Sequence, residues 1–424
     1  MKKQNQSLKP YLLLWGSQSL SGLGSAMTNF ALIIWLYQQS GSALETALLS
    51  ICSYAPYVLT SIFAGALSDR WNKKRTMLVC DSLAALCTVL VLVLLKTGLL
   101  APWHMYVLNG LNGLMNTVQQ PAGDVAATLL IPKEHYQRTS GLRSLSQSLT
   151  TILTPALASA LFAFSGMDLV IGVDLCTFAI AFCTLAFLIA IPETPQEEKP
   201  REKLLDSAKL GLRWLQKNPL ILQLILFLAC INLVASAFNA TLPAFILPRE
   251  NGGETVLGLV NAFEGIAALA GSIAVTLLPE PKNRVRVICL SLMVSMSTEN
   301  FLLAFSQTPW LWCLGSILGW MTIPLMNANM DVVFRSSIPT EMQGRVYSCR
   351  NTLQFFTIPL GYFLGGLLVD QAFEPLMANR ADGALVWLFG TGKGSGAALM
   401  LFVLGIAGVL VCLIFQGILK KYRF

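Results

Sequence analysis

The chain has 424 residues, of which 54% are hydrophobic and only 12% are charged. A soluble globular domain carries roughly a quarter charged residues, so this composition excludes an ordinary soluble enzyme and a disordered chain. The formal net charge is +7. An excess of positive charge is compatible with a nucleic acid partner, and the positions of the charged residues along the chain test this possibility.

Long apolar segments recur along the whole chain. A helix that crosses a bilayer needs about 20 mainly apolar residues. Twelve segments meet this requirement, at roughly 11–36, 44–67, 76–95, 102–123, 141–164, 168–190, 220–246, 255–278, 285–305, 309–333, 346–370 and 396–419. The sequence therefore predicts an all-α membrane protein with twelve transmembrane helices.

The basic residues are distributed unevenly between the loops. Cytoplasmic loops of membrane proteins carry an excess of lysine and arginine. With the N-terminus in the cytoplasm, 25 of the 29 basic residues fall on the cytoplasmic side, and the other side holds only Lys96, Arg249, Arg380 and Lys393. The positive charge thus predicts orientation, with both termini cytoplasmic, and it argues against binding to nucleic acid.

One pattern occurs twice, at an offset of 207 residues. Ile131-Pro132-Lys133-Glu134 corresponds to Ile338-Pro339-Thr340-Glu341. The same offset relates three charged pairs, namely Asp124 and Asp331, Arg138 and Arg345, and Arg143 and Arg350. The repeat predicts two pseudo-symmetric six-helix halves, 1–191 and 220–424. Parallel repeats of this kind are typical of transporters that work by alternating access.

The segment 192–219 joins the two halves. Leucines recur at helical spacing from Leu204 to Leu215, and Lys209, Arg213 and Lys217 occupy other positions. This pattern predicts an amphipathic helix that lies on the cytoplasmic surface of the bilayer.

The loop after the second apolar segment carries a recognisable motif. It reads Gly65-Ala66-Leu67-Ser68-Asp69-Arg70-Trp71-Asn72-Lys73-Lys74-Arg75 and resembles the G-x-x-x-D-R-x-G-R-K-R loop of the major facilitator superfamily. Asn72 stands where the family has its second glycine, and asparagine also tolerates a left-handed backbone. The resemblance implies that Asp69 caps the start of span 11, near Gly344 and Arg345, and so latches the two halves in one state.

Other stretches resemble the macrolide-efflux branch of this superfamily, which contains drug and siderophore exporters. They are Ser21-Gly22-Leu23-Gly24-Ser25, Pro121, the two Ile-Pro-x-Glu segments, and Gly211-Leu212-Arg213-Trp214-Leu215 with Asn218-Pro219. The resemblance and the repeat together predict a set of gate residues, with the repeated acids and arginines as structural pairs. The set is Gly65, Asp69, Arg70, Lys73, Lys74, Asp124, Arg138, Arg143, Asp331, Arg345 and Arg350.

Several acidic residues lie inside the predicted spans, where a carboxylate is costly and hence a functional candidate, and four of them lie deepest. We regard Glu264, Glu299 and Asp81 as candidates for proton coupling, and Asp174 as structural. In the superfamily, spans 3, 6, 9 and 12 lie away from the cavity. We therefore expect Glu264 in span 8 to face the cavity or a gate, Glu299 in span 9 to lie further out, and Asp81 to join the gate network. The alternative for each is a neutral, hydrogen-bonded carboxyl group.

Uncharged polar residues are scattered through the apolar spans. The candidates for a substrate cavity are Asn29, Asn112, Asn116, Asn232, Asn239 and Asn327, with Gln119 a further polar group in span 4. Apolar walls with a few polar points suit a bulky amphipathic ligand. The alternative is that these asparagines connect neighbouring helices.

Motifs for other chemistries are absent from the sequence. There is no phosphate-binding G-x-x-x-x-G-K-[ST] loop, zinc spacing or hydrolase motif. We therefore expect no enzymatic activity, no cofactor and no metal. The resemblance implies a monomeric, proton-coupled exporter of a macrolide-like compound in the plasma membrane of a bacterium. The alternatives are a siderophore or lipid transporter of the same fold, or a membrane sensor that transports nothing.

Overall fold

The computed structural model describes residues 8–132, 136–192, 204–378, 380 and 382–422. Every regular element in this part of the chain is a helix. Within it, nine helices are long and apolar enough to cross a membrane. The all-helical membrane fold is thus confirmed, and the count of twelve spans stays a prediction.

The chain divides into two compact units. Unit 1 comprises Met1–Trp35 and Cys52–Glu198, and unit 2 comprises Leu36–Ile51 and Lys199–Phe424. The division passes through two continuous helices, α1 (Lys9–Ser40) and α2 (Ala43–Arg70). The last residues of α1 and the first residues of α2 therefore belong to unit 2, although most of both helices lies in unit 1.

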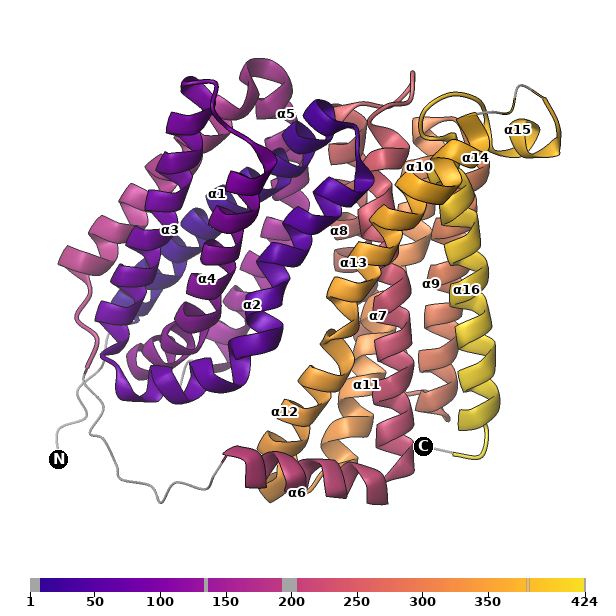
Figure 1. Ribbon diagram of the computed structural model, residues 1–424. Helices are drawn as coiled ribbons and strands as arrows, with labels where there is room; N and C mark the ends of the chain where they lie inside the picture. The colour runs from indigo at the N-terminus through magenta and orange to yellow at the C-terminus, as the bar shows by residue number, and fades with distance from the viewer. Residues whose placement is uncertain (1–7, 133–135, 193–203, 379, 381, 423–424) are drawn as a thin grey trace. The chain divides into compact units, whose positions relative to one another are not determined.

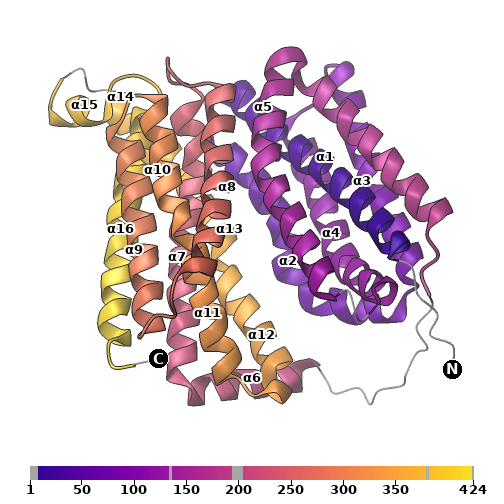
Figure 2. The same ribbon diagram turned by 180° about the vertical axis from the view of Figure 1, so that it is seen from behind.

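Unit 1 also contains α3 (Lys73–Lys96), α4 (Pro102–Leu130), α5 (Tyr136–Cys183) and the π-helical turn η2 (Thr184–Leu188). α3 packs against α4 and α5 (Figure 2). Two predicted spans, 141–164 and 168–190, fall within the continuous stretch of α5 and η2. They are separated at Gly166, whose φ of 71° interrupts the helix, because glycine alone enters this backbone region without strain.

The start of α3 corrects one detail of the motif. Asn72 has φ −60° and ψ 118°, and its side chain accepts a hydrogen bond from the backbone N–H of Arg75. Asn72 is thus an ordinary helix N-cap. The expected tolerance for left-handed backbone is not used.

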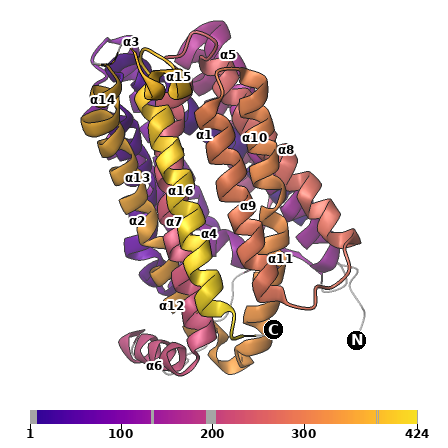
Figure 3. The same cartoon turned by 90° about the vertical axis from the view of Figure 1, so that its right-hand side faces the viewer.

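Unit 2 contains the remaining helices. They are α6 (Leu204–Lys217), α7 (Pro219–Ile246), α8 (Glu254–Leu277), α9 (Arg284–Phe305), α10 (Pro309–Met321), α11 (Ile323–Ser337), α12 (Thr340–Phe355), α13 (Thr357–Leu368), η3 (Val369–Phe373), α14 (Glu374–Ala378), α15 (Ala384–Phe389) and α16 (Ser395–Leu419). α16 packs against α7 and α9 (Figure 3). Predicted spans 10 and 11 are each divided into two helices, and Pro324 and Pro359 lie in the first turn of the second helix, where proline is tolerated.

The predicted amphipathic helix is present as α6. Gly211 and Leu215 are buried, and Lys209, Arg213 and Lys217 are exposed. α6 packs against α12 and α7 and runs across their ends (Figure 1). One face of α6 is therefore fixed to unit 2, and the basic face is free for a bilayer surface, which stays a prediction.

Candidate functional site

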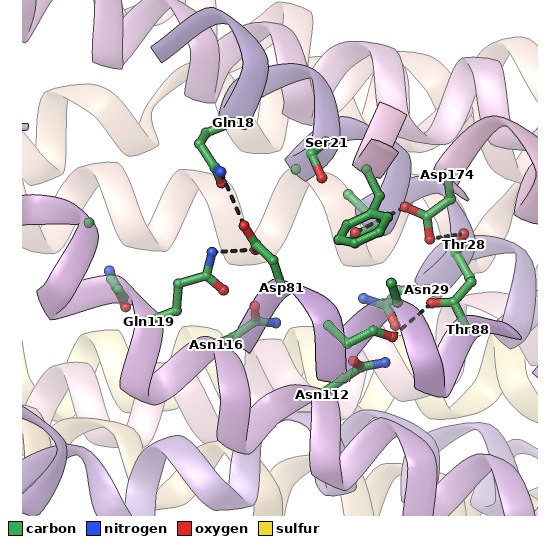
Figure 4. A pocket seen from close by; sticks show the side chains of 18 of the residues that line it. Gln18, Ser21, Thr28, Asn29, Asp81, Thr88, Asn112, Asn116, Gln119 and Asp174 are labelled. Atoms are coloured by element: carbon green, nitrogen blue, oxygen red, sulfur yellow. Dashed lines mark hydrogen bonds between the residues drawn. The ribbon is translucent and has the colours of Figure 1, made fainter. Parts of the chain in front are cut away.

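A cavity of about 640 Å³ lies within unit 1, between α1, α3, α4 and α5. Asn29, Asn112 and Asn116 all line it, as expected for cavity residues (Figure 4). Apolar side chains such as Trp15 and Phe178 form part of the wall. The volume lies in the usual range of roughly 300–1,000 Å³ for pockets that hold drug-sized ligands.

Asp81 faces this cavity with its carboxylate held by two amides. Gln18 Nε2 lies 3.2 Å from Oδ2 of Asp81, and Gln119 Nε2 lies 2.5 Å from Oδ1 (Figure 4). Arg143, the one basic residue among the described residues that line the cavity, is paired with Asp124 at 2.8 Å instead. Neutral donors orient the Asp81 carboxylate without cancelling its charge. Asp81 thus points from α3 towards α1 and α4, and its expected part in the gate network stays a prediction.

Asp174 joins α5 to α1. Its carboxylate accepts hydrogen bonds from Ser25 Oγ at 3.1 Å and Thr28 Oγ1 at 2.8 Å. The two helices approach closely here, since a Cβ on Gly24 would lie 3.0 Å from the Cα of Asp174. This geometry is that of a structural residue, as expected, although Asp174 also contributes to the cavity wall.

The predicted gate residues of unit 1 are only partly brought together. Asp124 and Arg143 form an ion pair. Lys74 donates instead to the carbonyls of Ala186 at 2.9 Å and Ile189 at 2.7 Å, where it caps the end of η2, and Lys73 Nζ lies 3.3 Å from the carbonyl oxygen of Trp71. The side chains of Gly65, Asp69, Arg70, Arg138 and Arg345 lie outside the described residues, so the latch between Asp69 and the start of span 11 stays a prediction.

Asp331, the counterpart of Asp124 in unit 2, forms an ion pair within its own helix. Asp331 pairs with Arg335 at 3.8 Å, one helical turn away on α11, and its expected pairing with the repeated arginines stays a prediction, because the Arg345 side chain lies outside the described residues. Arg350 donates to Gln354 Oε1 at 3.0 Å, and its guanidinium lies 4.5 Å from the centre of the Phe334 ring. A guanidinium over an aromatic ring at this distance is a cation–π contact.

A second cavity, of about 270 Å³, lies within unit 2. Asn232, Asn239 and Asn327 line it, so the other three predicted asparagines also share one cavity. Asn232 donates to the backbone carbonyl of Gln354 at 3.0 Å. The six asparagines thus fall into two sets, one in each unit.

Glu299 also lines this second cavity, whereas Glu264 does not. Both side chains are buried, at 4% and 8% exposure. Trp320 donates its indole N–H to Glu299 Oε1 at 3.1 Å, while Oε1 of Glu264 is buried without a hydrogen-bond partner. Within unit 2 it is thus Glu299, expected further out, that reaches a cavity, and the expectation that Glu264 faces a gate stays a prediction. Gly319 on α10 leaves room for the Glu299 side chain, since a Cβ there would lie 2.7 Å from that of Glu299.

Two residues with a clear part in these sites were not assigned from the sequence. Gln18 holds Asp81, and Trp320 holds Glu299. The only signal in the sequence is polarity, since Gln18 interrupts the first apolar segment and an indole N–H in a span needs an acceptor. Among the described residues, no group of three or more histidine, cysteine, aspartate or glutamate side chains has the spacing of a metal site.

Comparison with known proteins agrees with this architecture. Residues 14–362 match the Major Facilitator Superfamily. Macrolide efflux protein A of Streptococcus pyogenes is 22% identical over 375 residues, which cover 88% of this chain and 92% of that protein. The multidrug efflux pump Tap of Mycolicibacterium fortuitum is 24% identical, over 87% of this chain and 91% of its own length. The enterobactin exporter EntS of Citrobacter koseri is 25% identical over 66% of each chain.

Solved structures of low sequence identity share the fold. The nucleoside transporter NupG superposes with a TM-score of 0.66 at 13% identity, over 98% of this chain and 100% of that one. A bacterial homologue of the human lysosomal transporter Spinster, in an inward-facing and unoccupied conformation, has a TM-score of 0.69 at 13% identity, over 98% and 96% of the two chains. The chain is a multi-pass membrane protein and belongs to the Major Facilitator Superfamily.

Proposed function

We propose that the protein is a secondary active exporter that moves an amphipathic organic compound out of a bacterial cell by alternating access and proton antiport. The observation that carries this proposal is the Asp81 carboxylate, which two amides orient towards a cavity of about 640 Å³ and which has no basic partner among the described residues. A ligand that brings its own positive charge would complete this site. The apolar wall would take the remainder of the ligand.

The efflux activity of relatives from three bacterial genera supports the direction of transport. A macrolide or a dye that carries a protonated amine has the required chemistry, with one charge on a bulky apolar body. A compound with a net negative charge would be repelled by Asp81. A siderophore or lipid of that charge is therefore the weaker candidate.

Proton coupling is proposed for the carboxyl pair of unit 2. Both side chains are buried, and a buried carboxylate without a counter-ion is costly, so the pair is proposed to hold a proton. Glu299 lines the cavity and can exchange this proton with water, whereas Glu264 is the buried partner. One elementary charge that crosses a potential of 100 mV is worth about 2.3 kcal/mol, so a single proton supplies useful driving force.

The membrane arrangement belongs to the same proposal. Twelve spans in two six-helix halves, 1–191 and 220–424, would be joined by the cytoplasmic segment 192–219 with its amphipathic helix. Both termini would lie in the cytoplasm, as the distribution of basic residues predicts. The protein would act as a monomer, with protons and a small organic compound as its partners.

The test is export from intact bacterial cells. Cells that express the wild type or Asp81→Asn are loaded with a cationic dye, a macrolide with a basic amine, or an uncharged dye of similar size, with and without a protonophore. Asp168→Asn is the matched control, because Asp168 is an exposed acid of unit 1 that pairs with Lys96. Protonophore-sensitive export of the cations by the wild type and the control, with loss in Asp81→Asn, supports the proposal. Export of none of the compounds contradicts it and favours a siderophore transporter, a lipid transporter or a sensor.

A further inference from the structure

The end of α1 and the start of α2 (residues 36–51, the joint) are bound by one carboxylate to η3, a part of unit 2 that is remote in the sequence. Asp370, in η3, lies within hydrogen-bond distance of three donors at the start of α2. Ser42 Oγ lies 2.6 Å from Oδ2, the backbone N–H of Leu44 lies 2.9 Å from Oδ2, and that of Ala43 lies 3.0 Å from Oδ1. These partners are more than 320 residues away along the chain.

This carboxylate completes the cap of α2. The first turn of a helix has N–H groups without partners inside the helix. Ser42 Oγ accepts from the N–H of Glu45 at 3.1 Å, and Asp370 accepts from the two preceding N–H groups. A negative charge at a helix start is further stabilised by the helix dipole, and hydrogen bonds to an ionised acceptor are the stronger kind.

Other contacts locate the same joint on unit 2. Tyr37 donates its hydroxyl to the backbone carbonyl of Ala244 at 3.4 Å, and Gln38 Nε2 lies 3.0 Å from Glu254 Oε1. Gly366, one turn before Asp370, allows a close approach, since a Cβ there would lie 2.6 Å from the Cα of Leu44. Residues 36–51 are therefore held to unit 2 by polar groups and one glycine contact.

This fastening has a mechanical consequence. Most of α1 and α2 belongs to unit 1, while their joined ends belong to unit 2. If the two units move against each other, either both helices bend near residues 35–52 or the contact at Asp370 opens. Water can hydrogen-bond to the carboxylate, the serine hydroxyl and the two N–H groups once they separate, so opening this contact is an alternative to bending two continuous helices.

We propose that Asp370 is a gate residue, and that its contact with the first turn of α2 forms in one transport state and breaks in the other. The inference rests on the proposed alternating access. Each end of α2 would then carry one gate contact. Asp370 binds the first turn of the helix, and Asp69, in its last turn, makes the predicted contact with the start of span 11. The two contacts would then be made in opposite states of the cycle.

A reversible cross-link tests this inference. In Ser42→Cys/Asp370→Cys, oxidation joins the two positions and reductant frees them. Release during the cycle predicts that the oxidised protein in proteoliposomes exports at least roughly tenfold more slowly than the same sample after reduction. Ser42→Cys alone is the control for the ten native cysteines, all of which are free, and it should be insensitive to oxidation. Equal export by the cross-linked and reduced protein would show that the joint never leaves unit 2, and would overturn the inference.

A second measurement does not depend on export. Hydrogen exchange at Ala43 and Leu44 is followed in the wild type and Asp370→Asn, with Asp168→Asn as control. Loss of the capping carboxylate should speed exchange there roughly 3- to 30-fold, in line with the usual cost of a lost N-cap. The wild type should also exchange faster at these sites than in the middle of α7. Exchange as slow as in α7, and unchanged in Asp370→Asn, overturns the inference. If exchange at these sites is fast but the protein exports no compound, the result supports the gate role of Asp370 and contradicts only the proposed efflux.

Discussion

Gln119 donates a hydrogen bond from its side-chain amide to Asp81, with Nε2 2.5 Å from Oδ1. Because Gln18 supplies a second amide to the other oxygen, the carboxyl group is fixed in direction. In a soluble protein water would complete the shell around such a group. Here the carboxylate faces a cavity whose walls combine polar and apolar side chains, and the proposed ligand is a cation with an apolar body.

Asp81→Asn should therefore weaken the binding of cations more than that of uncharged compounds. A hydrogen bond to a charged group is worth about 1.5–3 kcal/mol, so the Kd for a cationic dye should rise roughly 10- to 150-fold. The Kd for an uncharged dye of similar size should change less than about threefold. Fluorescence titration of the purified protein measures both values. An unchanged Kd for the cation, with Asp168→Asn as reference, would show that Asp81 does not contact the ligand.

Neutralising Glu299 should separate binding from coupling. In Glu299→Gln the proton has no site that opens to the cavity, so the compound still binds but a proton gradient no longer drives its transport. Trp320→Phe removes the indole N–H that holds Oε1 and keeps an aromatic ring, so it should reduce the rate without abolishing coupling. Glu264→Gln should have the smaller effect of the two glutamine substitutions, because Glu264 does not line the cavity. If Glu299→Gln keeps proton-driven transport and Glu264→Gln loses it, the coupling proton is carried by Glu264 and not by Glu299.

The sequence was sufficient for the all-helical membrane fold and for six asparagines that line the two cavities, but not for the orientation of single side chains. Apolar length predicts the long helices, and the asparagines line cavities because polar groups avoid the lipid. The surroundings of Glu299 on α9 could not be predicted, because the space for its side chain is provided by Gly319 on another helix, α10. Likewise, Gln18 meets Asp81 over a separation of 63 residues, and Asp370 meets Leu44 over 326, which no local pattern encodes. Asp331 also forms an ion pair with Arg335 in its own helix, a contact that the sequence repeat does not predict.

The packing of α4 against α2 depends on one glycine. A Cβ on Gly113 would collide with the backbone carbonyl of Ser53, whereas a Cβ on Gly110 would meet that of Cys52 at an ordinary 3.7 Å. Gly113→Ala should lower the free energy of unfolding by about 1–3 kcal/mol, as expected when a packed interface must shift. Gly110→Ala, one turn earlier on the same helix, is the matched control and should change little. Equal thermal shifts for the two variants in detergent would contradict this account of the interface.

Arg249 fixes the loop that follows α7. Its Nη2 donates to the carbonyls of Phe389 at 2.9 Å and Gly394 at 3.3 Å, and burial lowers the pKa of its guanidinium to about 10. Arg249→Met should destabilise the protein by about 1–3 kcal/mol, because two carbonyls lose a donor. Arg380→Met, at an exposed position, should stay within about 0.5 kcal/mol of the wild type.

The same group gives a pH prediction. Burial lowers the pKa of Arg249 in the folded protein below its value in the unfolded chain. Loss of this proton therefore increases the free energy of unfolding, and it does so only as the pH rises through about 10. The stability difference between the wild type and Arg249→Met should therefore be constant from about pH 6 to pH 8, well below this pKa. A step in that difference within this range, measured by thermal unfolding, would contradict the assigned charge state.

The most direct test of proton-driven export is made in proteoliposomes that contain only this protein. A pH gradient is imposed across the membrane, and uptake of a cationic dye into inside-out vesicles is followed with and without an ionophore that collapses the gradient. The account predicts accumulation by the wild type that stops when the gradient is collapsed, and none in Glu299→Gln despite intact binding of the dye. Accumulation that is insensitive to the gradient, or equal in the wild type and Glu299→Gln, would contradict proton antiport through this carboxyl pair.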